Sequence, residues 1–177
     1  MAEVTRYTPT GSEAMMRFAT SLSHEDRNFL KEDASDPAVL DRWARASDVD
    51  RFVAIQDGNV VGYVGIHPLA GWSSHVSEVR VLVAPESRGA GLGQRLVQTA
   101  VAVAVGDDKE KLVVEVVADQ EATIGMLQAN GFVPEALLAD QVRDRQGQLR
   151  DLMVLSCRAK ELAGDLELLG VAESLAE

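Results

Sequence analysis

The order of hydrophobic and polar positions divides the chain into short strands and amphipathic helices. Where apolar residues alternate with polar ones the pattern predicts a half-buried strand, and where they recur every three or four residues it predicts a helix. Aspartate, glycine and proline separate these segments. We expect strands over 4–8, 51–56, 60–66, 78–83, 111–118, 137–144 and 148–158, a further strand starting at Phe132-Val133, helices over 13–22, 37–45 and 121–129, and helices beginning after Ser23, after Gly93 and at Ala159.

Local signals fix several of these ends. Ser12 and Ser23 stand where N-caps belong, and Pro37 occupies the first position of its helix. Gly131, after Asn130, predicts a left-handed cap at the end of the helix over 121–129. Asp57-Gly58-Asn59 and the segment 145–147 predict hairpin turns. The valine-rich segment 111–118 predicts a strand buried on both faces.

The stretch from Val79 to Ala104 joins a strand to a helix through a glycine-rich loop. Alternation places Val79, Val81 and Val83 on one side of the strand and Glu78, Arg80 and Leu82 on the other. The glycines let the backbone turn tightly, and N–H groups at the start of a helix have no intrahelical partner. The helix dipole adds partial positive charge there. The stretch therefore predicts a phosphate-binding site.

The spacing of the glycines distinguishes among the protein families that bind phosphate with such a loop. A nucleoside-triphosphate P-loop needs Lys-Ser/Thr after its last glycine, whereas Gln94-Arg95 follows here. A dinucleotide-binding fold spaces its glycines differently. Arg88, Gly91 and Gly93 match Arg/Gln-x-x-Gly-x-Gly/Ala, which resembles the acetyl-CoA-binding motif of the GNAT N-acetyltransferase superfamily. A plain glycine turn is the structural alternative.

This resemblance implies an α/β (α+β) fold, with a mixed, mostly antiparallel sheet flanked by helices, and acetyl-CoA as cosubstrate. It covers residues 1–158, which we expect to form one domain, with 159–177 as an acidic helical tail. The tail is either a solvated end or a dimer contact. The implied acetyl-CoA-binding residues are Val81, Leu82, Val83, Arg88, Gly89, Ala90, Gly91, Leu92, Gly93, Gln94 and Gln120.

A second similarity lies in the segment from Glu121 to Phe132, which ends in Asn130-Gly131-Phe132 as family helices commonly do. Two positions differ from the family pattern. Gln120 stands where asparagine is usual, and Leu127 stands where many members have a tyrosine that protonates the leaving thiolate. Another residue would then have to protonate the thiolate, and the side-chain types allow Tyr63, His67, His75 or Cys157.

Attack on a thioester requires a neutral amine, because ammonium has no lone pair. In the family a glutamate on the strand before the phosphate loop often accepts that proton, which makes Glu78 the candidate general base. Its alternative role is a solvated or ion-paired carboxylate. A backbone N–H near Leu82 and Val83 could stabilise the oxyanion.

Composition limits the other possibilities. The 177 residues carry a net charge of −11, which argues against binding to nucleic acid, and no apolar run is long enough for a membrane span. The N-terminus lacks a signal-peptide pattern and the one cysteine excludes an internal disulfide, so we expect a cytoplasmic protein. The histidine and cysteine spacing predicts no metal site.

The leading interpretation is an N-acetyltransferase that uses acetyl-CoA and acts on a primary amine, either a small molecule or a protein lysine or N-terminus, with a homodimer as an option. The alternatives are a CoA or acetyl-CoA sensor with little catalysis, and an interaction protein without cofactor. The segments 12–45 and 68–74 are expected to recognise the acceptor, whose identity the sequence leaves open.

Overall fold

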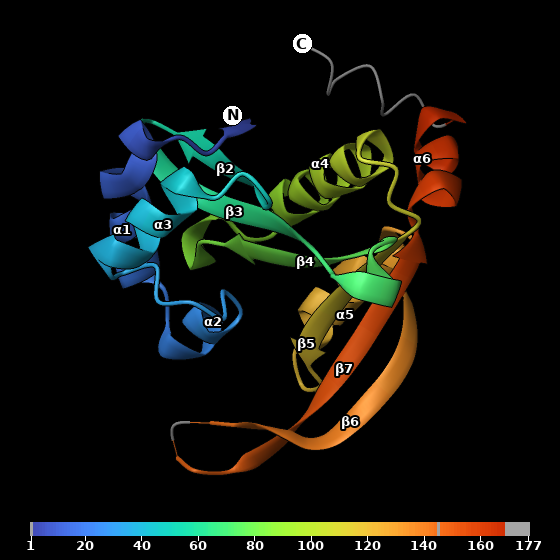
Figure 1. Ribbon diagram of the computed structural model, residues 1–177. Helices are drawn as coiled ribbons and strands as arrows, with labels where there is room; N and C mark the ends of the chain where they lie inside the picture. Colours follow the sequence, from blue (N-terminus) through green and yellow to red (C-terminus); the bar gives the residue numbers. More distant parts are fainter. Residues whose placement is uncertain (1, 145, 169–177) are drawn as a thin grey trace. The chain divides into compact units, whose positions relative to one another are not determined.

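A computed structural model describes residues 2–144 and 146–168 (Figure 1). The described residues leave out Arg145, which belongs to the second predicted hairpin turn. They also leave out residues 169–177, the end of the predicted tail. The strands are β1 (Glu3–Arg6), β2 (Asp50–Gln56), β3 (Asn59–Pro68), β4 (Val76–Val83), β5 (Lys111–Val117), β6 (Val133–Arg143) and β7 (Leu149–Arg158); the helices are α1 (Ser12–Ser21), α2 (His24–Asn28), α3 (Pro37–Arg45), α4 (Leu92–Gly106), α5 (Glu121–Ala129) and α6 (Ala159–Leu168).

The strands form one sheet in the order β1-β2-β3-β4-β5-β7-β6. β4 and β5 pair in parallel, whereas β1 with β2, β2 with β3, β5 with β7 and β6 with β7 pair antiparallel. The expected mixed, mostly antiparallel sheet flanked by helices is therefore confirmed. The chain clusters into two compact units: an N-terminal unit of residues 1–67 and 80–96, and a C-terminal unit of residues 68–79 and 97–177.

The caps and turns of the N-terminal unit follow the local signals, with one exception. Ser23 Oγ accepts from the Asp26 N–H at 3.0 Å and caps α2, and Pro37 begins α3. Asp57 and Gly58 both have positive φ, as a two-residue hairpin turn of mirror-image type requires. The prediction for Ser12 is wrong: Gly11 is the N-cap of α1, and the Ser12 hydroxyl instead bonds the Tyr7 hydroxyl at 2.8 Å.

An aromatic and charged cluster fills the core between α3 and the strands of this unit. The rings of Trp43 and Tyr63 stack with centroids 5.3 Å apart, and the Arg51 guanidinium lies 4.8 Å from the Trp43 ring centroid. Trp43 Nε1 donates to the Glu32 carboxylate at 2.9 Å. The buried indole N–H therefore has the partner that burial demands.

In the C-terminal unit, β5 departs from its prediction. Leu112, Val114 and Val116 are buried, but the residues that alternate with them are only half-buried. The second face carries Lys111 and Glu115, whose charged ends favour contact with water. β5 is thus buried on one face, not on both.

Figure 1 shows β6 and β7 as a long, curved hairpin. The sequence suggested two separate strands here, but β6 runs without a break from Val133 to Arg143. Its register with β7 shifts between Pro134 and Ala136 and between Leu138 and Val142. Such bulges let a strand continue past a proline, which has no N–H to donate to the ladder.

The end of α5 and the start of α6 pack together. Gly131 has φ +82°, so the predicted left-handed cap is confirmed, and a Cβ placed on it would lie 2.6 Å from Leu162 Cδ1. α6 runs from Ala159 to Leu168 and continues through Gly164, although glycine inside a helix favours an interruption.

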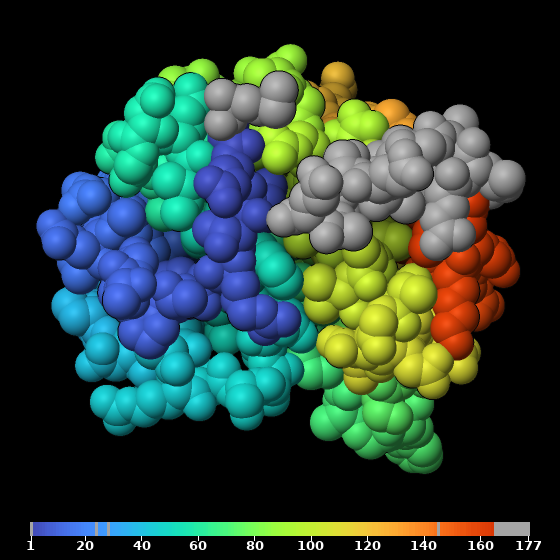
Figure 2. All heavy atoms as spheres, turned by 90° about the horizontal axis from the view of Figure 1, so that it is seen from above, coloured from blue at the N-terminus to red at the C-terminus, as the bar shows by residue number. Residues whose placement is uncertain are grey.

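The connection between β3 and β4 is prominent on the surface. Figure 2 shows the green segment around residues 68–75 standing out from its surroundings. Trp72 in this segment is 98% exposed.

Candidate functional site

The glycine-rich loop adopts the conformation that its sequence predicts. After β4 a single 3₁₀ turn covers Pro85–Ser87, and α4 begins at Leu92. Gly89 has φ +79° and Gly91 has φ +77°, in the left-handed region that glycine enters without strain. The Gly91 carbonyl accepts from the Arg95 N–H at 3.1 Å, which makes Gly91 the residue that opens the helix.

The loop is exposed and its glycines face open space. Residues Gly89, Ala90, Gly91 and Gln94 are exposed, whereas Leu92 is buried beneath the first turn of α4. A Cβ placed on Gly89 or Gly91 would meet no atom within 4 Å. Packing therefore does not require glycine here; the backbone conformation does, and the open space lets an anion approach the N–H groups at the start of α4.

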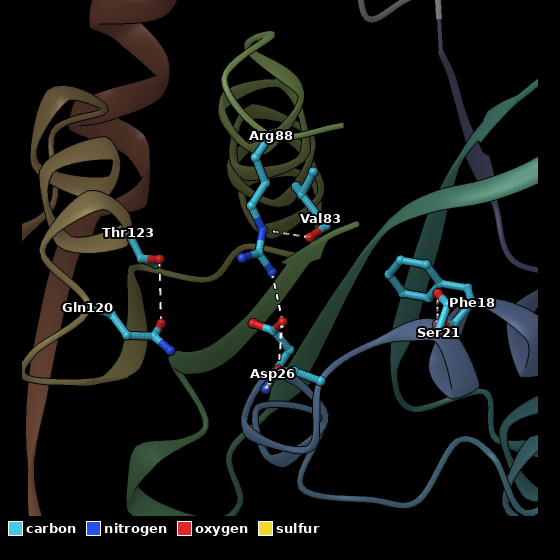
Figure 3. Close-up of polar contacts among 8 residues, drawn as sticks. Phe18, Ser21, Asp26, Val83, Arg88, Gln120 and Thr123 are labelled. Atoms are coloured by element: carbon cyan, nitrogen blue, oxygen red, sulfur yellow. Dashed lines mark hydrogen bonds and ion pairs between the residues drawn. The ribbon is translucent and has the colours of Figure 1, made fainter. Parts of the chain in front are cut away.

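The Arg88 side chain is held in two places (Figure 3). Its Nε donates to the Val83 carbonyl at 3.1 Å, and its Nη2 lies 2.9 Å from Oδ2 of Asp26 in α2. The first contact ties the loop to the last residue of β4. The second was not foreseen from the sequence, because nothing in the sequence near Asp26 indicates a partner in the glycine loop.

β4 carries the candidate base Glu78 and the implied acetyl-CoA-binding residues Val81, Leu82 and Val83. Its first residues pair in parallel with β5, with Val76 opposite Lys111 and Glu78 opposite Val113. The strand continues to Val83.

Burial along β4 does not follow strict alternation. Val79 and Leu82 are buried, while Val81 and Val83 are half-buried. Glu78, the candidate base, is half-buried and stands in register with Val113 of β5.

The second predicted segment is organised around α5. Gln120 is the N-cap residue of α5 and is half-buried; the Thr123 hydroxyl donates to its Oε1 at 3.5 Å. Leu127 has no exposed surface. It therefore contributes packing at the position where family members often carry a tyrosine.

Two of the four residues considered as the acid lie in the core. Tyr63 is 1% exposed, and burial raises its pKa well above the ordinary value of 10.0. Cys157 is buried, and this burial raises the pKa of its thiol to about 12. His67 is half-buried and His75 is exposed. Burial leaves Tyr63 and Cys157 out of contact with an incoming substrate.

The described residues contain no group of three or more His, Cys, Asp or Glu side chains placed to hold a metal ion. In the same part of the chain, every helix is too short or too polar to cross a bilayer.

The sequence model of the acetyltransferase (GNAT) family matches residues 16–132, which is more than half of the chain. The chain belongs to the acetyltransferase (GNAT) family. The match spans the segment from α1 to the end of α5, including the glycine loop and Glu78. No curated protein matches this acetyltransferase sequence.

Solved structures share the fold of this acetyltransferase. Ribosomal-protein-alanine N-acetyltransferase from Brucella melitensis has a TM-score of 0.75 and 22% identity, covering 88% of this chain and 99% of that one. A chimera of spermidine N-acetyltransferase from Vibrio cholerae and hSSAT has a TM-score of 0.75 and 15% identity, covering 92% and 98%. A GNAT superfamily phosphinothricin acetyltransferase from Sinorhizobium meliloti, in complex with acetyl-CoA, has a TM-score of 0.75 and 15% identity, covering 89% and 88%.

Proposed function

We propose that this acetyltransferase transfers the acetyl group of acetyl-CoA to a primary amine. The observation that carries the proposal is the open glycine loop at the start of α4, where Gly89 and Gly91 have positive φ and face free space. Backbone N–H groups in this arrangement bind phosphate. The acetyl-CoA complex of the phosphinothricin acetyltransferase, which has the same fold, supports acetyl-CoA as cosubstrate.

Within this proposal the diphosphate of CoA binds the N–H groups of residues 89–94. The pantetheine arm lies along Val81, Leu82 and Val83 and adds to the strand edge, since peptide-like amides dock where a strand has unpaired N–H and C=O groups. These three residues are the last of β4 and stand directly before the glycine loop. Gln120, at the start of α5, is the remaining proposed CoA contact.

The proposed chemistry is a direct transfer. Glu78 accepts a proton from the ammonium form of the acceptor, directly or through water. The neutral nitrogen then forms a bond to the thioester carbon, and the C–S bond breaks to release the CoA thiolate. A backbone N–H near Leu82 and Val83 stabilises the negative charge on the carbonyl oxygen between these steps. The proton on the product nitrogen leaves to solvent or to the thiolate.

The acceptor class rests on the fold relatives together with this geometry. The three solved relatives carry names that specify acetylation of a protein alanine, spermidine and phosphinothricin. These acceptors differ in size and charge, so they support an amine acceptor without selecting one. We assign acceptor recognition to the segments 12–45 and 68–74, the second of which carries the exposed Trp72.

The test is release of free CoA from acetyl-CoA in the presence of polyamines, amino acids and peptides with different N-termini. Glu78→Gln should lower the rate by about 10²–10⁴-fold with little change in acetyl-CoA affinity. The loss should shrink as the pH approaches the amine pKa of about 10, because more acceptor then arrives neutral. Glu3→Gln, which removes an exposed strand carboxylate in β1, is the matched control and should keep the wild-type rate.

A second candidate function is a CoA or acetyl-CoA sensor, and the buried Leu127 favours it because this side chain has no proton to give to the thiolate. Tight CoA binding with no CoA release on any amine would select the sensor. A wild-type pH profile in Glu78→Gln would move the base role to another residue. Failure of the wild-type protein to bind CoA would refute both functions.

A further inference from the structure

The ion pair between Asp26 and Arg88 joins α2 to the first residue of the phosphate-loop motif (Figure 3). The Asp26 side chain is 15% exposed and that of Arg88 is 49% exposed. Asp26 Oδ2 accepts a hydrogen bond from the Ser23 hydroxyl at 2.9 Å and pairs with the Arg88 guanidinium at 2.9 Å. The carboxylate is therefore anchored on α2, whereas the guanidinium reaches it from an exposed loop.

This arrangement places a negative charge beside a loop that has the conformation of an anion site. The positive charge of Arg88 is balanced by Asp26, so the loop offers a diphosphate its backbone N–H groups and helix dipole but little net charge from this side chain. A diphosphate and a carboxylate compete for the same guanidinium, since both accept its N–H groups in the same geometry.

We propose that Asp26 is a positioning residue that competes with the CoA diphosphate for Arg88. In the CoA-free protein the Arg88 guanidinium is bound to Asp26, and when CoA binds the guanidinium turns from the carboxylate to the diphosphate. The Arg88 Nε bond to the Val83 carbonyl keeps the side chain at the loop in both arrangements. The inference rests on the proposed CoA site and adds to it a residue on α2.

The exchange links CoA binding to the acceptor side of the molecule. Asp26 lies in the segment 12–45, to which acceptor recognition is assigned, and its carboxylate is mostly buried. When Arg88 leaves, the carboxylate keeps the Ser23 hydroxyl but loses its counter-charge, which raises the free energy of this arrangement of α2. CoA binding should therefore increase amide hydrogen exchange in α2.

The decisive measurement is the Kd for CoA in Asp26→Asn and in Arg88→Gln. Asn keeps the size of Asp and can still accept from Ser23, but it releases the guanidinium. Asp26→Asn should bind CoA about two- to fivefold more tightly, the range expected from removing a partly exposed ion pair. Arg88→Gln should bind CoA about tenfold more weakly, because one charge-assisted hydrogen bond is lost.

The two variants are expected to change the CoA Kd in opposite directions, which distinguishes competition for Arg88 from a purely structural ion pair. If the ion pair only stabilised the loop conformation, Asp26→Asn and Arg88→Gln would weaken CoA binding by similar factors. The double variant would then have the same Kd as each single variant. Competition predicts that the gain from Asp26→Asn is smaller when Arg88 is already Gln. Asp50→Asn is the control for net charge, because it removes a carboxylate that pairs with Arg6 of β1 outside the segment 12–45, and it should leave the Kd unchanged.

Acetyl-pantetheine, which has no diphosphate, tests the ligand group. Acetyl-pantetheine should bind wild type and Asp26→Asn with equal affinity. The proposal would be overturned if Asp26→Asn bound both acetyl-pantetheine and CoA more tightly than wild type does. It would also be overturned if Asp26→Asn bound CoA no more tightly than wild type. Asp26→Ser, folded by its thermal midpoint, is the second variant and should tighten CoA in the same direction. Wild-type protein that binds no CoA would refute the proposed function itself, whereas wild-type binding without the Asp26 effect would refute only the exchange.

Discussion

Gly91 allows the phosphate loop to be tested against an internal control. Gly91 and Gly58 share φ +77°, and a Cβ on either would meet no atom within 4 Å. They belong to the same unit, but Gly58 forms the β2–β3 turn and Gly91 opens α4. Replacing each by alanine therefore imposes the same backbone strain in two different places.

The expected stability costs are equal. An L-residue in the left-handed region costs about 1–2 kcal/mol, and neither site adds a steric clash. For a chain of this size each kcal/mol lowers the thermal midpoint by about 2–4 °C, so both variants should lose about 2–8 °C. Stability thus serves as the common reference for the binding measurement.

The expected effects on CoA are unequal. At Gly91 the added methyl group enters the space through which a diphosphate approaches the N–H groups of α4. Loss of one charge-assisted hydrogen bond costs about 1.5–3 kcal/mol, which corresponds to a Kd about 10- to 150-fold higher. Gly91→Glu should weaken binding further, because it adds a repelling charge. Gly58→Ala should keep the wild-type Kd.

Isothermal titration calorimetry with CoA and a thermal scan of the apo variants measure both quantities. A folded Gly91→Ala protein with the Kd of Gly58→Ala would remove the diphosphate from this loop and refute the reasoning. A larger stability loss in Gly91→Ala than in Gly58→Ala would show that packing, not ligand approach, selects glycine at Gly91.

Two further predictions concern buried side chains. Leu127→Ala should lower the free energy of unfolding in urea by about 2–5 kcal/mol, since Leu127 has no exposed surface, and should leave the shape of the pH–rate profile unchanged; a new inflection would contradict a role in packing alone. The pKa of Cys157 is about 12 in the folded protein and 9.0 ordinarily, so between pH 9 and 12 the thiol ionises in the unfolded chain but not in the folded one. The contribution of the buried thiol to the free energy of unfolding is therefore complete below pH 9 and is lost as the pH rises toward 12. Wild type should lose up to about 1.4 kcal/mol per pH unit relative to Cys157→Ala in that window, and equal slopes in urea unfolding would contradict the buried thiol.

The sequence by itself determined the features that depend on neighbouring residues. The Ser23 cap, the Asp57-Gly58 turn and the left-handed cap at Gly131 all followed from side-chain type at a fixed offset. Such signals are local, because a cap or a turn is complete within four or five residues. They were enough to locate the glycine-rich loop and to indicate the family.

The tertiary structure alone decided which distant residues meet. Asp26 has no sequence signal for Arg88, and nothing in the sequence of β4 shows that Glu78 stands opposite Val113 of β5. Alternation likewise could not show that Leu82 is buried while Val81 is half-buried. The physical reason is that register, burial and long-range ion pairs depend on how elements pack, and each element's own sequence is compatible with several packings.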